Sequence, residues 1–103
     1  MIHVIAIITA KPGQREAILE AARANIAAVR AEAGCIEYGP AIDAEGIGKF
    51  QARLGPDSFV VVEKWESAEA LKAHAAAPHM AAYAAKTKDL SESRVIHVLS
   101  PAA

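Results

Sequence analysis

Two segments of the chain are apolar at consecutive positions, and this feature most limits how the chain can fold. Residues 4–8 read VIAII and residues 59–62 read FVVV, so apolar side chains occupy both odd and even positions. Their β-branched residues favour strands, in which successive side chains point to opposite faces of a sheet. Both faces of these strands therefore need cover. Helices can cover one face, and we expect the same face of a second copy of the chain to cover the other, which predicts a homodimer.

Turn residues and the spacing of apolar residues divide the chain into strands and helices. Strands are predicted over residues 2–9, 35–42, 59–65 and 94–99, with a weaker one over 50–54. Helices are predicted over residues 14–33, 67–77 and 79–88, with Ser67 as an N-cap and Pro78 separating the last two. The order strand, helix, strand, strand, helix, strand predicts an α+β fold, a ferredoxin-like sandwich in which helices cover one face of an antiparallel sheet.

Composition indicates one globular domain over residues 1–103 and argues against several classes of partner. Lys and Arg number 11 against 12 Asp and Glu, so no basic field is expected for nucleic acid or an anionic membrane. The apolar stretch 2–10 lacks a basic start and a cleavage site of small residues, and it is too short to span a bilayer. The single cysteine, Cys35, cannot form an internal disulfide, which fits a reducing, cytoplasmic location.

Most side chains that could carry chemistry gather in residues 63–83, EKWESAEALKAHAAAPHMAAY. Glu63 and Trp65 share one face of the predicted strand. A carboxylate in that apolar setting needs a donor, and nearby histidines could supply it. We expect a pocket between helices and sheet, lined by Glu63, Trp65, His74, His79 and Tyr83, with Tyr38 of the second strand.

A purely structural role is the alternative for these residues. Trp65 is typical of a core. His74 could simply be held by Glu63 or a carbonyl group, and His79 could bond the turn before Pro78. No metal site is expected, because the five-residue spacing of the two histidines, interrupted by Pro78, does not place both imidazoles on one helix face.

Three segments together resemble the antibiotic biosynthesis monooxygenase (ABM) family, most closely its small bacterial quinol monooxygenases. They are VIAIITAKPGQ, AEAGCIEYGP and PDSFVVVEKWESAEALKAHAAAPHMAAY. The most specific part is E-x-W followed by H-x-x-x-x-H, at Glu63, Trp65, His74 and His79. The resemblance implies a dimeric α+β barrel with one pocket per subunit. It also implies oxidation of a quinol or related polyphenol by O₂ with no metal, flavin or haem cofactor.

The resemblance also suggests roles for the pocket residues. A base that removes a phenolic proton would make electron transfer to O₂ feasible, because a quinol anion is more electron-rich than the neutral quinol. We expect this base to be His79 or His74, oriented by Glu63. Trp65 is expected to pack on the substrate, and Tyr38 or Tyr83 to hydrogen-bond one of its oxygens.

Other activities found on similar chains are the alternatives. Haem-degrading relatives use an Asn on the first strand and a Trp and His pair on the second helix, whereas this chain has no such Asn and carries His74 and Ala84 at those helix positions. A related branch isomerises a small phosphorylated signalling sugar, which would need a phosphate site built from Arg53 and Lys72. The third alternative is a non-catalytic dimer that binds a small aromatic molecule.

Overall fold

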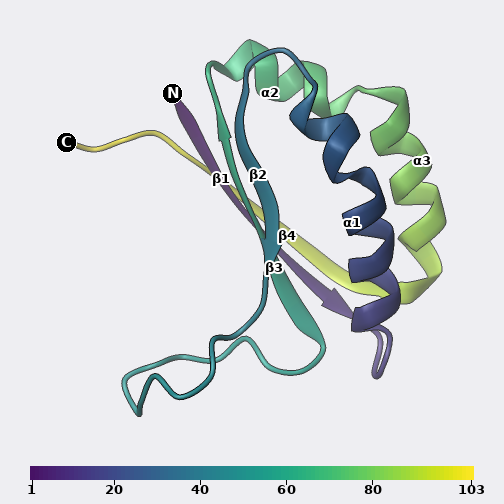
Figure 1. Ribbon diagram of the computed structural model, residues 1–103, viewed down its shortest axis with the longest axis vertical. Coiled ribbons are helices and arrows are strands. Elements are labelled where there is room, and N and C mark those ends of the chain that lie inside the picture. Colours follow the sequence, from purple (N-terminus) through teal and green to yellow (C-terminus); the bar gives the residue numbers. More distant parts are fainter.

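The computed structural model describes all residues from 1 to 103 and places three helices on one side of an antiparallel sheet (Figure 1). The strands are β1 (Ile2–Ala10), β2 (Cys35–Ala41), β3 (Ser58–Trp65) and β4 (Ser91–Leu99). The helices are α1 (Arg15–Arg30), α2 (Ala68–Ala75) and α3 (Pro78–Thr87), and a short 3-10 turn, η1 (Lys88–Leu90), leads into β4. The strands lie in the order β2-β3-β1-β4. The predicted ferredoxin-like α+β fold is confirmed.

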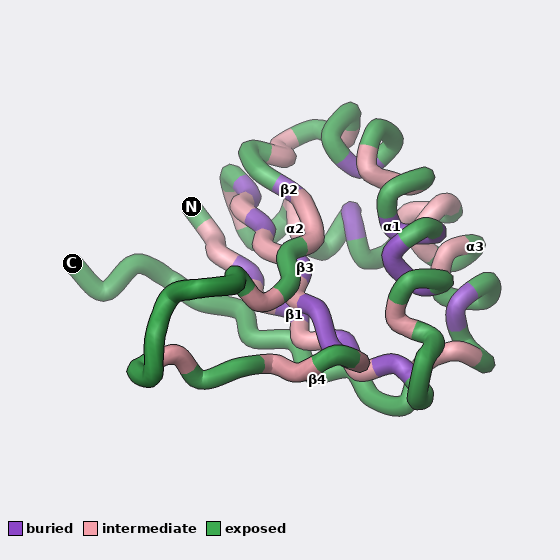
Figure 2. The backbone as a smooth tube through the Cα atoms, turned by 60° about the horizontal axis from the view of Figure 1, so that its bottom comes forward, coloured by how far each residue is buried: buried purple, intermediate pink, exposed green.

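The register of the sheet decides which side chains face the helices. Val4 of β1 pairs with Glu63 of β3, and Ala6 pairs with Val61. Buried and half-buried residues therefore alternate along β1, as the colours of Figure 2 show. The buried set packs under the helices, where Trp65 has no exposed surface. This inner face forms the core and, at one end, the floor of the site described below.

The opposite, outer face of the sheet carries no helix. Ile5 and Ile7 of β1 lie on it with their partners Val62 and Val60, and all four are only half-buried. On β4, Val95 pairs with Ile7 and is 49% exposed. The sequence prediction that both faces of the central strands are apolar is confirmed, and nothing within the chain covers the outer one. None of the helices has both the length and the apolar character needed to cross a bilayer.

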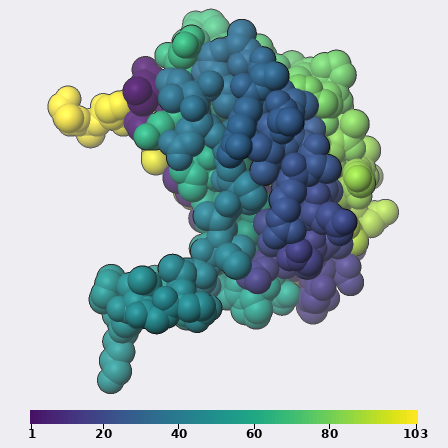
Figure 3. Space-filling model, in the orientation of Figure 1, coloured from purple at the N-terminus to yellow at the C-terminus, as the bar shows by residue number.

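The loop over residues 42–57 corrects one predicted strand. It extends away from the body of the molecule, as Figures 1 and 3 show. Residues 50–54 lie within it and form no strand. The carboxylate of Asp43 accepts the backbone N–H groups of Leu54 and Gly55 at 2.9 Å each, so these donors are satisfied by a side chain rather than by a neighbouring strand.

Two further boundaries differ from the prediction. Helix α1 ends at Arg30, three residues early, because the chain turns through residues 31–34 and Gly34 adopts a φ of 83°. Strand β4 begins at Ser91 instead of Arg94, because its pairing with β1 continues past an irregularity to Ala10. The predicted N-cap of α2 is confirmed, since the hydroxyl of Ser67 accepts a hydrogen bond of 3.1 Å from the backbone of Ala70.

Candidate functional site

A cavity of about 820 Å³ lies between the sheet and helices α2 and α3. Its volume falls in the range of small-molecule sites. The floor consists of inward-facing apolar residues of three strands: Val4, Ala6, Ile8, Val61, Ile96 and Val98. Among the predicted site residues, those on the cavity wall are Tyr38, Glu63, His74 and Tyr83.

His74 lines this cavity, and only one of its two ring nitrogens has a hydrogen-bond partner. Its Nδ1 atom lies 2.8 Å from Oε2 of Glu32. An ionised carboxylate only accepts hydrogen bonds, so Nδ1 is the atom that carries a proton here. When the ring is neutral, its free lone pair is therefore on Nε2. Nε2 has no hydrogen-bond partner, and its distance of 3.9 Å from Oε1 of Glu63 is too long for one. No fully buried side-chain nitrogen or oxygen of the chain lacks a partner. The unpartnered Nε2 must therefore retain accessible surface.

Two aromatic rings hold the imidazole of His74 in place. The indole of Trp65 lies with its centroid 4.6 Å away at an interplanar angle of 33°. The ring of Tyr38 meets the imidazole edge-on at 5.6 Å and 62°. Such contacts stabilise a pair beyond the area that it buries. The orientation of His74 is therefore fixed by packing as well as by its hydrogen bond to Glu32.

Glu63 is a buried carboxyl group beside the free nitrogen of His74. Its Oε1 accepts a hydrogen bond of 2.9 Å from the indole N–H of Trp65. Burial raises the pKa of Glu63 above its usual 4.5, while the Trp65 hydrogen bond opposes that rise, as does the positive charge of the His74 ring whenever it is protonated. Negative charge at this position would stabilise His74 once the imidazole had taken up a proton.

Glu32 is the site residue that the sequence analysis missed. Its Oε2 also receives a hydrogen bond of 3.0 Å from Nε2 of His79, so both histidines meet on one carboxylate oxygen. The predicted partner was Glu63, which bonds neither imidazole. Glu32 lies 42 residues before His74, and its only signal was its place in the segment AEAGCIEYGP, just before the glycine turn.

Gly34 brings Glu32 to the histidines. Its carbonyl accepts the backbone N–H of Glu66 at 2.8 Å, which ties the turn after α1 to the end of β3. A Cβ atom on Gly34 would lie only 2.6 Å from Cβ of Ala70, so the turn packs directly against α2. The close approach and the positive φ both require glycine here. The turn thereby places Glu32 near the helix that carries His74.

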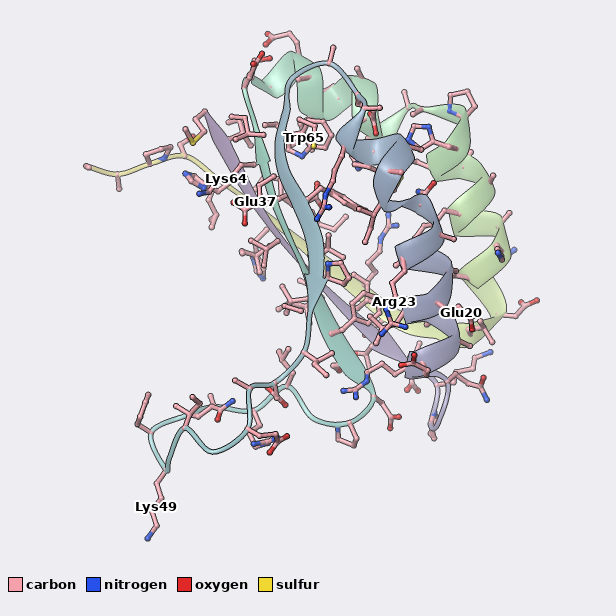
Figure 4. All side chains as sticks on the ribbon, viewed as in Figure 1. Glu20, Arg23, Glu37, Lys49, Lys64 and Trp65 are labelled. Carbon is pink, nitrogen blue, oxygen red and sulfur yellow. The ribbon has the colours of Figure 1, made fainter.

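The structure separates Trp65 and His79 from the cavity. Trp65 has no exposed surface and lies behind the wall, so the predicted direct packing of its ring on a substrate does not fit this position. Figure 4 shows Trp65 enclosed between the sheet and the helices. The side chain of His79 is 31% exposed but does not line the cavity. Of the two histidines, His74 is therefore the one placed to meet a ligand there.

Two tyrosines supply hydroxyl groups on the wall. Burial raises the pKa of both Tyr38 and Tyr83 above the usual 10. Both are therefore neutral near pH 7, where a phenol can donate a hydrogen bond. Of the cations considered for a phosphate site, Lys72 lines the cavity. Arg53 does not, because it lies on the 42–57 loop, 2.7 Å from the carboxylate of Glu45.

Glu32, His74 and His79 also form a set of groups of the kind that bind metal ions. Their donor atoms lie within 4.8 Å of one another. Pro78 does interrupt the helix as predicted, yet the two imidazoles converge, because they meet on a residue from a different element. Both hydrogen bonds to Glu32 need a proton on the ring nitrogen, and a metal ion would have to displace those protons.

Comparison with known proteins gives one consistent result. The family model described as antibiotic biosynthesis monooxygenase matches residues 1–86. A protein of Escherichia coli (strain K12) named "Probable quinol monooxygenase YgiN" is 39% identical over 103 residues, which cover 98% of each chain.

Solved structures agree with this match. PA3566 from Pseudomonas aeruginosa has a TM-score of 0.82 and 31% identity, over 99% of this chain and 94% of that one. Rv0793 from Mycobacterium tuberculosis has a TM-score of 0.80 and 29% identity, over 99% and 95% of the two chains. The chain therefore belongs to the antibiotic biosynthesis monooxygenase family.

Proposed function

We propose that this protein oxidises a quinol or related polyphenol with O₂ in the cavity beside His74, without a metal, flavin or haem cofactor. The observation that carries the proposal is the free Nε2 of His74 on the wall of an apolar cavity. The 39% identity to a protein named as a probable quinol monooxygenase supports the class of substrate.

In the first step, Nε2 of His74 takes the proton of a phenolic hydroxyl group. Glu32 stabilises the resulting imidazolium through its hydrogen bond to Nδ1, and the Glu63 carboxyl lies 3.9 Å from the newly protonated Nε2. General-base catalysis of this kind contributes typically about 10²- to 10⁴-fold to a rate. The substrate is left as an electron-rich anion on the mainly apolar floor of the cavity.

In the second step, the quinol anion reduces O₂. If no oxygen is inserted, two electrons and two protons pass from the quinol to O₂, which gives a quinone and hydrogen peroxide. If oxygen is inserted, one atom of O₂ enters the ring and the other leaves as water, which gives a hydroxyquinone. Both reactions balance without an additional reductant. We expect Tyr38 and Tyr83, which line the cavity, to donate hydrogen bonds to the substrate's oxygens.

We also propose that two copies associate through the outer face of the sheet. The apolar side chains at Ile5, Ile7, Val60 and Val62 support this, because a sheet face that is apolar and uncovered favours burial against a partner. The ion pair between Lys64 and Glu37, at 3.3 Å, lies on the same side and points away from the helices in Figure 4. It would lie among the polar groups of such an interface.

Oxygen consumption tests the proposed reaction. The protein, treated with a chelator, is mixed with 1,4-dihydroxynaphthalene, and uptake is corrected for autoxidation. We expect enzyme-dependent uptake that His74→Gln lowers about 10²- to 10⁴-fold. His79→Gln is the matched control and should retain most of the activity, because His79 does not line the cavity. Uptake equal to the autoxidation rate would contradict the proposal, and ligand binding without uptake would favour a non-catalytic binding protein.

A further inference from the structure

The cavity has two chemically different ends. At one end, Val4 pairs with Val98 and with Glu63, and Oε1 of Glu63 lies 3.9 Å from Nε2 of His74. At the other end, Ile8 pairs with Arg94 on the same inner face. The two rows are four positions apart on β1, which corresponds to about 13 Å along an extended strand. The floor between them is apolar, because Ala6 and Ile96 occupy the intermediate row.

The end far from His74 carries two cations. Arg94 projects from the inner face of β4, and Lys88 lies in η1, the turn that leads into that strand; both line the cavity. Neither has a carboxylate within ion-pair distance, although Glu92 also lines this end. The positive charge of Arg94 also acts on Tyr83 and Glu63. In both groups it offsets part of the rise in pKa that burial causes.

We propose that Arg94, assisted by Lys88, binds a carboxylate group of the substrate, so that the substrate is a hydroxylated aromatic acid. A guanidinium group can hold a carboxylate through two parallel hydrogen bonds. Both cations are exposed to solvent, so water weakens the charge attraction and the paired hydrogen bonds carry most of the expected preference. We place the hydroxyl of such a fused-ring acid at His74 and its carboxylate at Arg94, because these residues belong to opposite ends of the same cavity. This orientation rests on the proposed function, which assigns the hydroxyl to His74.

Binding of redox-stable ligands tests this inference without any turnover. Calorimetry would compare 6-hydroxy-2-naphthoate, its methyl ester and 2-naphthol; the acid and the ester have nearly the same shape and differ in charge. We expect the acid to bind at least about tenfold more tightly than the ester, which is the gain typical of one charge-assisted hydrogen bond. Arg94→Gln should remove that advantage and leave the affinity for the ester within about twofold.

The matched control is Lys49→Gln, which removes one positive charge from the tip of the 42–57 loop. Lys49 points away from the body of the molecule in Figure 4, so the control should keep the full preference for the acid. Equal affinity for acid and ester in the unchanged protein would overturn the inference, as would an Arg94→Gln variant that weakens both ligands equally. Tighter binding of 6-hydroxy-2-naphthyl phosphate than of the acid would overturn the inference, because it would show that this end of the cavity binds a phosphate group instead of a carboxylate. A protein that binds the acid through Arg94 but takes up no oxygen would refute the proposed oxidation alone.

Discussion

The Nδ1 atom of His74 donates a hydrogen bond of 2.8 Å to Glu32, which belongs to a turn 42 residues earlier in the chain. This contact fixes the tautomer of His74 and leaves Nε2 free beside Glu63. Trp65 supports the arrangement twice, by stacking on the imidazole and by donating to Glu63. The site is thus one buried polar network in which each member orients the next.

Replacing Glu32 by Gln should lower kcat more than it changes KM. The amide oxygen can still accept from Nδ1, but the negative charge that stabilises the protonated imidazole is lost. We expect kcat to fall by up to about 10⁴-fold, as when the carboxylate that orients a catalytic histidine is replaced by its amide. Steady-state oxygen uptake measures both constants. Glu37→Gln on the outer face is the control, and an unchanged kcat in Glu32→Gln would show that Glu32 has no positioning role.

Replacing Glu63 by Gln should make stability less dependent on pH. Burial raises the pKa of Glu63 in the folded state, so above the usual value of 4.5 the folded protein binds more protons than the unfolded one. The free energy of unfolding therefore falls as pH rises through this window. The amide side chain of the Glu63→Gln variant would keep an acceptor for Trp65 but would not titrate.

Urea denaturation of both proteins at a series of pH values checks this, at a fixed protein concentration and with the fluorescence of the single tryptophan as the signal. Relative to the unchanged protein, the variant should gain stability as pH rises above 4.5. A difference that is constant, or that shrinks with rising pH, would contradict the assignment.

The sequence predicts the local parts of the site better than its long-range parts. Glu63, His74 and Tyr83 could be placed near the cavity because strand and helix periodicities put them on inward faces. Glu32 could not, because its position depends on where α1 ends and on how closely the Gly34 turn packs against α2. Neither feature has a periodic signal. The same limit explains the weak strand expected over 50–54, where the backbone N–H of Leu54 is bound by the carboxylate of Asp43, 11 residues earlier.

Replacing Gly34 by Ala should harm both stability and activity. The φ of 83° is unfavourable for alanine, and the new Cβ would overlap Cβ of Ala70. We expect a loss of about 2 kcal/mol or more in the free energy of unfolding, and a lower kcat because Glu32 moves away from His74. Thermal or urea denaturation measures the first effect. Gly13→Ala is an informative control, since its φ is also positive but no atom lies near the added Cβ. Equal losses in the two variants would show that packing against α2 is unimportant.

Replacing Val62 by Glu should weaken the proposed dimer. Val62 lies on the outer face next to Ile5, and two copies meeting there would bury the new charge without a partner. Light scattering should give twice the chain mass of 10.8 kDa for the unchanged protein at micromolar concentration and a single chain mass for the variant. Lys49→Gln should remain dimeric. A mass of one chain for the unchanged protein would rule the dimer out.

The proposed mechanism requires that Nε2 of His74 can accept a proton, so the first measurement is which ring nitrogen of His74 carries one. Nitrogen-15 NMR of the labelled protein near neutral pH, with His74 assigned by comparison with His74→Gln, distinguishes protonated from unprotonated ring nitrogens. We expect a protonated Nδ1, bound to Glu32, and an unprotonated Nε2. A neutral ring with its proton on Nε2 would contradict the proposed mechanism, because His74 could not then accept a proton from a substrate at that position.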